Sequence, residues 1–342
     1  MDIEGIKKRL HSKDYNFLRE NPNLGNSIIL LTLGGSHAYG MEKEGSDLDV
    51  RGIAFNSKNE ILLGKDFEEV VDTQTDTTIY SFNKMIRLLS SNNPNTIEIL
   101  GCKPEHYVQL SKVGEELLNN RKMFLSKICI HTFAGYAGSQ LRRLENKAAR
   151  LVGQAQNEEY VLRSIQNAEY DFKNRYLSCE EDAIKLYTDV SAQEGYEKEI
   201  YMDLHLKHYP LRDWVGMWNE MKSIVRSYNK IGKRNEHAIG HDKLGKHMAH
   251  LIRLYMMCID ILEKEEIITY REAEHALLMS IRNGEFLDEN RQPTSEFYDL
   301  LNEYEKRFDY AKKNTGLPDV PDYKRINEFK AWVNECVVKG AV

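Results

Sequence analysis

The pattern of apolar and polar positions over the first hundred residues predicts a small region of mixed strands and helices. Residues 27–33 are almost all apolar and rich in branched side chains, which is typical of a buried strand. A second strand is expected over 48–55, and one strand or a hairpin over the Thr- and Val-rich residues 67–80. Residues 82–90 instead have helical spacing, and residues 1–26 are expected to form a short helix and a loop.

Beyond about residue 120, charged and apolar residues follow long helical patterns. No proline lies between Pro104 and Pro210, or between Pro210 and Pro293, so helices can run without interruption. Helices are predicted over residues 127–147, 158–176 and 212–231, and a polar loop over 187–199. In the last of these helices Trp214 and Trp218 lie on one face, and core packing is the preferred explanation for them.

The two patterns together predict an α+β fold. A small mixed-sheet domain is expected over about residues 1–120, followed by an all-helical domain over 121–342. Composition places the chain among ordinary globular proteins, with 41% hydrophobic and 29% charged residues. A net charge of −6 argues against a protein that coats nucleic acid over its whole surface, but it allows a local basic site.

Cysteine usage, the charged first residues and the short length of the apolar runs predict a cytoplasmic protein. The five cysteines are widely spaced and form no Cys-x-x-Cys pair, which fits reduced thiols rather than a disulfide framework or a zinc ribbon. The first residues are charged and have no apolar centre, so no signal peptide is expected. No run of 18 apolar residues exists, so no membrane span is expected either.

The residues with the clearest chemical meaning lie between the first two predicted strands. Leu33–Gly40 reads LGGSHAYG and Gly45–Gly52 reads GSDLDVRG. Gly34 and Gly35 allow backbone amides to approach a ligand closely, and Ser36 can cap the start of a helix. A helix that begins there would direct its free N–H groups at an anion such as a phosphate.

Two aspartates follow at the start of the second predicted strand. Asp47 and Asp49 are two positions apart, so they share one face of a strand while Leu48 points to the core. Two carboxylates beside a phosphate-binding turn are suitable ligands for Mg²⁺ or Mn²⁺. Arg51 has the opposite parity, and it can either form an ion pair within the fold or reach a phosphate.

This combination resembles a known signature. Gly-Gly-Ser, a ten-residue gap and Asp-x-Asp resemble the DNA polymerase beta superfamily of nucleotidyltransferases. The longer match, Gly-Ser-His-Ala-Tyr-Gly followed by Ser-Asp-x-Asp-Val-Arg-Gly, resembles its RNA-repair-associated, RlaP-like branch. The resemblance implies a metal-dependent transfer of NMP from an NTP to an acceptor hydroxyl, with RNA or a tRNA-like molecule as acceptor. It also implies that the helical domain closes the active-site cleft.

The resembling superfamily uses a third carboxylate on a neighbouring strand. Asp72 and Asp76 are four positions apart and would share a face if the strand were regular. The resemblance favours Asp76 as the third catalytic and metal-binding residue, whereas a turn position is preferred for Asp72. Further on, Asn95 and Glu98 have the spacing of an N-cap and its reciprocal partner, so capping is the expected role of Glu98 even though Asn-Pro-Asn-x-x-Glu also resembles the family.

A basic stripe is predicted on one helix near residue 250. The helical wheel brings Lys243, Lys246, His247, His250 and Arg253 onto one third of the circle, opposite an apolar face. The absence of acids among them favours binding of nucleotide or acceptor phosphates over a plain solvated surface. The i, i+3 histidines also permit a metal site, which the neighbouring lysines disfavour. This stretch, residues 281–285 and residues 317–322 extend the RlaP-like resemblance, and residues 150–205 match it poorly.

The acceptor is the least determined feature. Residues 222–253 hold eight lysines and arginines against two acids, which favours a polyanion such as RNA. A protein side-chain hydroxyl, a small molecule, and a nucleotide-binding module without catalysis stay open as alternatives. Nothing in the residues specifies which NTP is used.

Overall fold

The computed structural model of the protein describes residues 3–43, 45–150, 183–190, 198–230 and 244–342. Contacts divide the chain into two compact units. The first comprises Met1–Phe133, Leu254–Leu278 and Glu305–Val342, and the second comprises Ala134–Arg253 and Met279–Tyr304. Each unit is built from separate stretches of the chain, whereas the predicted boundary at residue 120 divides the chain once along its sequence. That boundary stays a prediction.

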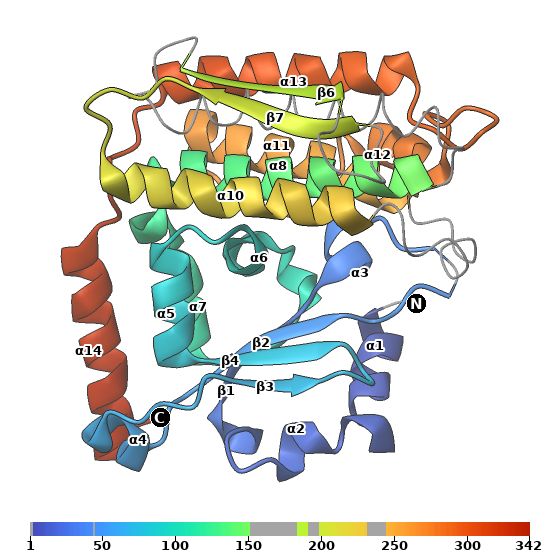
Figure 1. The fold of residues 1–342 in the computed structure, drawn as a ribbon. Helices are drawn as coiled ribbons and strands as arrows, with labels where there is room; N and C mark the ends of the chain where they lie inside the picture. Colours follow the sequence, from blue (N-terminus) through green and yellow to red (C-terminus); the bar gives the residue numbers. More distant parts are fainter. Residues whose placement is uncertain (1–2, 44, 151–182, 191–197, 231–243) are drawn as a thin grey trace. The chain divides into compact units, whose positions relative to one another are not determined.

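A five-stranded mixed sheet forms the centre of the first unit (Figure 1). Its strands are β1 (Ile28–Leu33), β2 (Val50–Ala54), β3 (Glu69–Asp72), β4 (Thr77–Ser81) and β5 (Tyr107–Leu110), in the order β3-β4-β2-β1-β5. The pair β2–β4 is parallel, and the other three pairs are antiparallel. This confirms the expected mixed sheet and shows that residues 67–80 form a hairpin. Every residue of β1 is buried, as its apolar run predicted.

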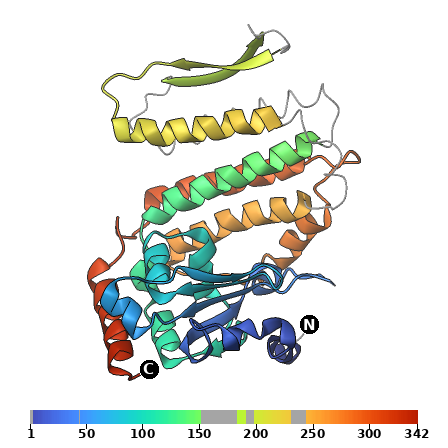
Figure 2. The ribbon, with the colours of Figure 1, turned by 60° about the horizontal axis from the view of Figure 1, so that its bottom comes forward.

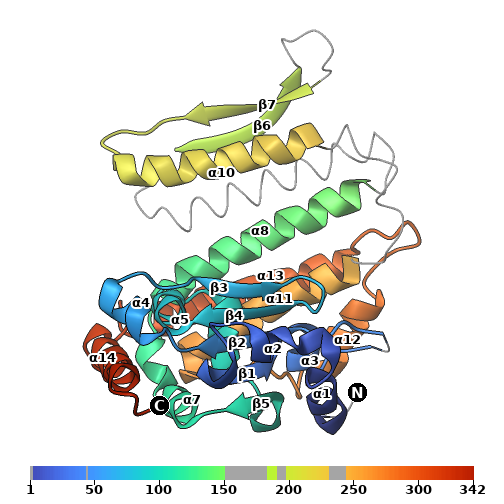
Figure 3. The ribbon, with the colours of Figure 1, turned by 90° about the horizontal axis from the view of Figure 1, so that it is seen from below.

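Short helices surround this sheet. They are α1 (Ile3–Leu10), α2 (Phe17–Glu20), α3 (Gly35–Tyr39), α4 (Lys58–Leu63), α5 (Phe82–Ser90), α6 (Pro94–Ile97) and α7 (Lys112–Asn119). The helix α5 has the predicted bounds, and the Ser81 side chain caps it by accepting from the Lys84 N–H. The last helix, α14 (Tyr323–Lys339), runs beside α4 and α5 (Figure 3), where Asn334 donates a hydrogen bond of 3.3 Å to Asn83.

The second half of the chain is mainly helical. Its long helices are α8 (Ile128–Arg150), α10 (Leu211–Lys230), α11 (Leu244–Lys264) and α13 (Ser295–Asn314), with the shorter α12 (His275–Asn283). Helices α8 and α10 agree with the predictions for 127–147 and 212–231, whereas the helix predicted over 158–176 lies outside the described residues. In the described part of the chain, no helix is long and apolar enough to cross a bilayer.

The described parts of the polar loop expected over 187–199, residues 187–190 and 198–199, belong to strands, and residues 191–197 lie outside the described residues. Strands β6 (Ile184–Val190) and β7 (Lys198–Leu204) form an antiparallel pair that packs on α10 (Figure 2). Alternate residues face the helix, where Ile184 and Leu204 contact the buried Met217 and Met221. The strands read as polar because the alternate positions Lys185, Asp189 and Asp203 are exposed.

The two tryptophans of α10 have different environments. Their rings stack with centroids 6.2 Å apart. Trp214 packs against the hydrophobic cluster under the hairpin, as expected, but Trp218 is 46% exposed. The expectation of core packing therefore holds for one tryptophan and not for the other.

Candidate functional site

The two halves of the glycine–aspartate motif lie in direct contact in the first unit. Strand β1 ends at Leu33, and the N–H of Gly34 donates a hydrogen bond of 2.9 Å to the carbonyl of Asp49. Gly35 has φ +52°, and a Cβ at this position would lie 1.4 Å from Asp49 Oδ2. Only glycine fits this close approach. The N-cap of α3 is Gly34 rather than Ser36, which is buried within the helix.

Asp47 and Asp49 lie in the extended segment just before β2, not within the strand. Leu48 between them is buried, as the alternation predicted, while Asp47 is exposed and Asp49 is partly buried. The His37 ring of α3 donates a hydrogen bond to the backbone carbonyl of Asp47. Burial lowers the pKa of His37, against the opposing effects of Glu42 and of this hydrogen bond.

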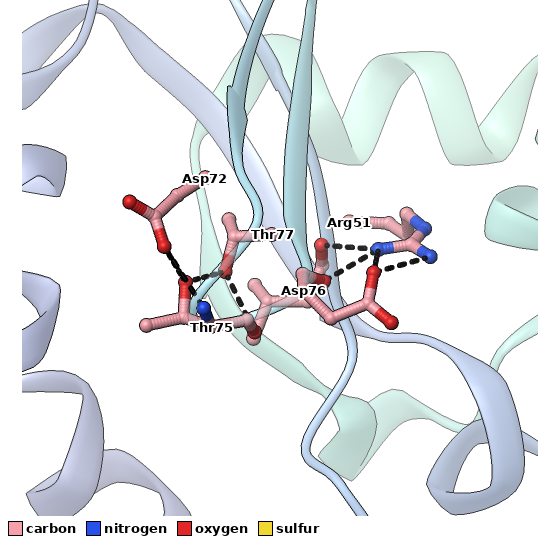
Figure 4. A network of polar contacts seen from close by, with 6 residues as sticks. Arg51, Asp72, Thr75, Asp76 and Thr77 are labelled. Carbon is pink, nitrogen blue, oxygen red and sulfur yellow. Dashed lines mark hydrogen bonds and ion pairs between the residues drawn. The ribbon is translucent and has the colours of Figure 1, made fainter.

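Arg51 connects the aspartate segment to the neighbouring strand (Figure 4). Strands β2 and β4 pair in parallel, and Arg51 of β2 lies opposite Thr78 of β4. Asp76 comes just before β4 in the chain, two residues before Thr78. Its Nη1 donates to the carbonyl of Asp76 at 2.7 Å, and its Nη2 lies 3.4 Å from Asp76 Oδ1. Of the two roles open for Arg51, the structure shows the ion pair within the fold.

Asp76 and Asp72 do not share a face of one regular strand. They lie at the two ends of the β3–β4 turn (Figure 4). The backbone of Asp76 has a positive φ of +46°. The Asp72 carboxylate accepts hydrogen bonds of 2.9 Å from the Thr75 N–H and from the Thr75 hydroxyl. It therefore shapes the turn, as preferred for it. The Asp76 side chain is 60% exposed and bonded to Arg51.

Glu98, for which helix capping was expected, has a different role in the structure. The N-cap of α6 is Asn93, whose side chain accepts from the Asn95 N–H at 3.0 Å, and Glu98 begins the next turn, η3 (Glu98–Gly101). The Glu98 carboxylate accepts a hydrogen bond from the Tyr39 hydroxyl at the end of α3. The resemblance of Asn-Pro-Asn-x-x-Glu to the family was the available signal, but capping was a sufficient explanation for it.

The pKa of Glu98 depends on its burial and on two charged neighbours. Burial raises the pKa of Glu98 to about 8. The Arg51 charge opposes this increase and the Asp49 charge adds to it. The Glu98 side chain nevertheless keeps part of its surface accessible to solvent.

The residues of the predicted basic stripe on α11 differ in how far they are exposed to solvent. Lys246 is exposed, His247 and His250 are partly buried, and Arg253 is only 4% exposed. The expectation of an open face therefore does not hold for Arg253, because α11 is buried on both sides of this residue and its guanidinium contacts the His250 ring. Burial, with help from Lys246 and Arg143, lowers the pKa of His250 to about 4. Lys243 lies outside the described residues.

The donor atoms at the aspartate segment suit a hard divalent cation. Asp47, Asp49 and Asp76 offer only oxygen ligands, which is the chemistry that Mg²⁺ and Mn²⁺ prefer. Within the described ranges, however, no three His, Cys, Asp or Glu side chains are already arranged around one point. Asp76 is bonded to Arg51 instead. The chemistry of these donor atoms fits a metal, and the Asp76 carboxylate is paired with Arg51 in this arrangement.

Comparison with known protein families agrees with the motif. A family model described as the RNA repair pathway DNA polymerase beta family (RlaP) matches residues 8–331. No curated protein and no solved structure showed a match to the chain.

Proposed function

The chain belongs to the RNA repair pathway DNA polymerase beta family, and from this premise we propose that it moves an NMP from an NTP to an acceptor hydroxyl, with an RNA or tRNA-like end as acceptor. One observation carries the proposal. The carboxylate of Asp49 lies directly on the backbone of Gly35, so a carboxylate and a glycine turn form one surface. Such a surface suits a phosphate chain together with its cation.

We assign the following roles to the residues of the site. The turn Gly34–Gly35–Ser36 would hold the phosphates of the NTP, and Asp47, Asp49 and Asp76 would hold Mg²⁺ or Mn²⁺. When bound, the metal would offset negative charge on the phosphates and on the attacking and leaving oxygens. Arg51 would release Asp76 and turn to a phosphate oxygen.

The reaction forms one bond and breaks one bond. The acceptor oxygen attacks the α-phosphorus in line, the bond from that phosphorus to the bridging oxygen breaks, and pyrophosphate leaves with its electron pair. The proton of the acceptor hydroxyl passes to a carboxylate of the site, for which Asp76 is proposed because its side chain is exposed.

The choice of RNA as acceptor rests on the family and on charge. The family description names an RNA repair pathway. The excess of lysine and arginine over residues 222–253 favours a polyanion, and two of these residues, Lys222 and Lys246, are exposed. Lys243, His250 and Arg253 stay proposed phosphate-binding residues. Transfer to a protein hydroxyl or to a small molecule is the competing possibility.

The decisive experiment follows labelled phosphate. The protein is incubated with each α-labelled NTP and Mg²⁺ or Mn²⁺, together with total RNA, tRNA or total protein, and label is located on a gel. We expect label in RNA, and its loss in Asp47→Asn and Asp49→Asn while the variants stay folded. Asp72→Asn is the matched control because it removes an acid outside the proposed metal site. Full transfer by either variant would refute the proposed role of the aspartates, and label in protein alone would refute the RNA acceptor.

A further inference from the structure

We propose that Glu98 is a further acidic residue of the transfer site, positioned by Tyr39, whose negative charge helps to hold the divalent cation of the incoming NTP. The inference rests on the proposed function and adds a residue that the glycine–aspartate motif does not contain. It starts from the failure of the capping explanation, since the N-cap of α6 is Asn93 and the Glu98 side chain bonds to Tyr39 instead.

The backbone around Glu98 is held by a distant segment of the chain. The Thr269 hydroxyl donates to the Glu98 carbonyl at 2.6 Å, and the Thr269 N–H donates to the Gly101 carbonyl at 3.1 Å. A Cβ at Gly101 would lie 2.3 Å from the carbonyl oxygen of Ile267, so the two segments cross in close contact. The Cys102 thiol also donates to the Glu98 carbonyl, at 3.5 Å. Glu98 therefore starts from a fixed backbone position.

The side chain of Glu98 is linked to the aspartate segment through one short helix. Tyr39, which donates to Glu98, is the last residue of α3, and Gly35, which contacts Asp49, is the first. The end of α3 is fixed by the same distant segment, because a Cβ at Gly40 would lie 2.4 Å from the Tyr270 ring. Glu98 and Asp49 are thus held by opposite ends of α3, and their distance is set by the fold.

The charges around Glu98 favour a cation. Asp49 disfavours the negative charge of Glu98, and Arg51, which favours that charge, is bonded to Asp76. A divalent cation that interacts with both carboxylates would offset this repulsion. A purely structural partner for the Tyr39 hydroxyl would need no charge, since an amide oxygen accepts the same hydrogen bond.

Two variants separate the charge of Glu98 from its hydrogen bond. Glu98→Gln removes the charge and keeps an acceptor for Tyr39, whereas Tyr39→Phe removes the hydrogen bond and keeps the charge. Binding of Mn²⁺ with a non-hydrolysable NTP analogue is measured by the loss of the free Mn²⁺ EPR signal, and transfer is measured as kcat and KM. We expect Glu98→Gln to weaken Mn²⁺ binding by about tenfold or more and to lower kcat, and Tyr39→Phe to have a smaller effect in the same direction.

The outcomes separate this inference from the proposed function. Wild-type Mn²⁺ affinity in Glu98→Gln, or a defect in Tyr39→Phe alone, would show a structural bond and overturn the inference. If Glu98→Gln does not fold, Glu98→Asp, which withdraws the charge by one methylene, is measured instead, and unchanged Mn²⁺ affinity there overturns it as well. A wild-type protein that transfers no NMP would refute the proposed function, while the Mn²⁺ measurement would still decide the role of Glu98.

Discussion

At the scale of single residues, Gly35 is the position where the fold and the site depend on the same atoms. Its positive φ and the 1.4 Å approach of Asp49 Oδ2 to a Cβ leave no room for a side chain. We expect Gly35→Ala to move the Asp49 carboxylate and to abolish transfer, and to lower the free energy of unfolding by more than the ~1 kcal/mol of a left-handed alanine.

Gly64 offers a matched control for this substitution. It has φ +63° at the end of α4, and a Cβ there would meet no atom within 4 Å. Gly64→Ala should cost about 1 kcal/mol of stability through backbone strain alone and should leave transfer unchanged. Thermal unfolding and transfer assays on the two variants test the difference. Equal transfer activity in Gly35→Ala and Gly64→Ala would show that the contact between Gly35 and Asp49 is not needed for transfer.

The raised pKa of Glu98 leads to a second prediction, which concerns how the free energy of unfolding changes with pH. Its folded-state pKa of about 8 lies above the usual value of 4.5, so the folded state binds the proton more tightly. The wild-type protein should therefore lose stability relative to Glu98→Gln as pH rises from 4.5 to 8, and the difference should be constant outside this window. We expect Glu98→Gln to be more stable at pH 8 by about 1–3 kcal/mol, measured by urea unfolding. A variant that is less stable at every pH would contradict the unfavourable charge of Glu98.

The residues of the site differ in how far the sequence reveals them. Asp47, Asp49 and the glycines are close in sequence, and they flank helix α3 at the adjoining ends of β1 and β2, where Asp49 contacts Gly34 and Gly35. Glu98 depends on contacts to Tyr39 and Thr269, which no local pattern encodes. Arg253 was misplaced because a helical wheel separates two faces but does not say how many of them are buried.

At the scale of elements, the β3–β4 turn distinguishes the two candidates for the third carboxylate. Asp72 holds the turn through Thr75, whereas Asp76 presents an exposed carboxylate beside Arg51. We expect Asp76→Ala to lower turnover far more than Asp72→Ala. Asp72→Ala should instead cost about 1 kcal/mol of stability through its lost hydrogen bonds. Steady-state kinetics and thermal unfolding of both variants provide the measurement, and a greater loss of turnover in Asp72→Ala would reverse the assignment.

Strand β1 and helix α5 were predictable because their local patterns agree with their final environment. Strand β1 is apolar throughout and fully buried, and α5 begins at a serine cap and has clear helical spacing. The β6–β7 hairpin was missed because exposed charged residues alternate with its packed ones, so the segment reads as polar. The alternation of packed and exposed residues indicates a strand only once it is known that α10 covers one side of the segment.

At the scale of the whole molecule, the charge distribution predicts how nucleic acid binding responds to salt. The protein carries a net charge of −6, so binding to RNA has to use local cations such as the exposed Lys246. If Lys246 contacts a phosphate of the acceptor, Lys246→Gln should reduce the slope of log affinity against log salt by about 0.7–0.9. Lys112→Gln, an exposed lysine of the first unit, is the control and should leave the slope unchanged. An unchanged slope in Lys246→Gln would remove this residue from the acceptor site.

The pairing of Arg51 with Asp76 has a consequence for the order in which ligands bind. Each of these charges has the other as a partner, so at the proposed site a free cation would compete with Arg51, and a free triphosphate would compete with Asp76. A metal–nucleotide complex satisfies both partners at once. We therefore expect Mn²⁺ alone and NTP alone to bind weakly and each to strengthen the other, as isothermal titration calorimetry can show. Arg51→Gln should reduce this mutual strengthening, because Asp76 would then have no cationic partner to lose. In the wild-type protein, the ion pair would favour binding of the metal and the nucleotide together over binding of either one alone.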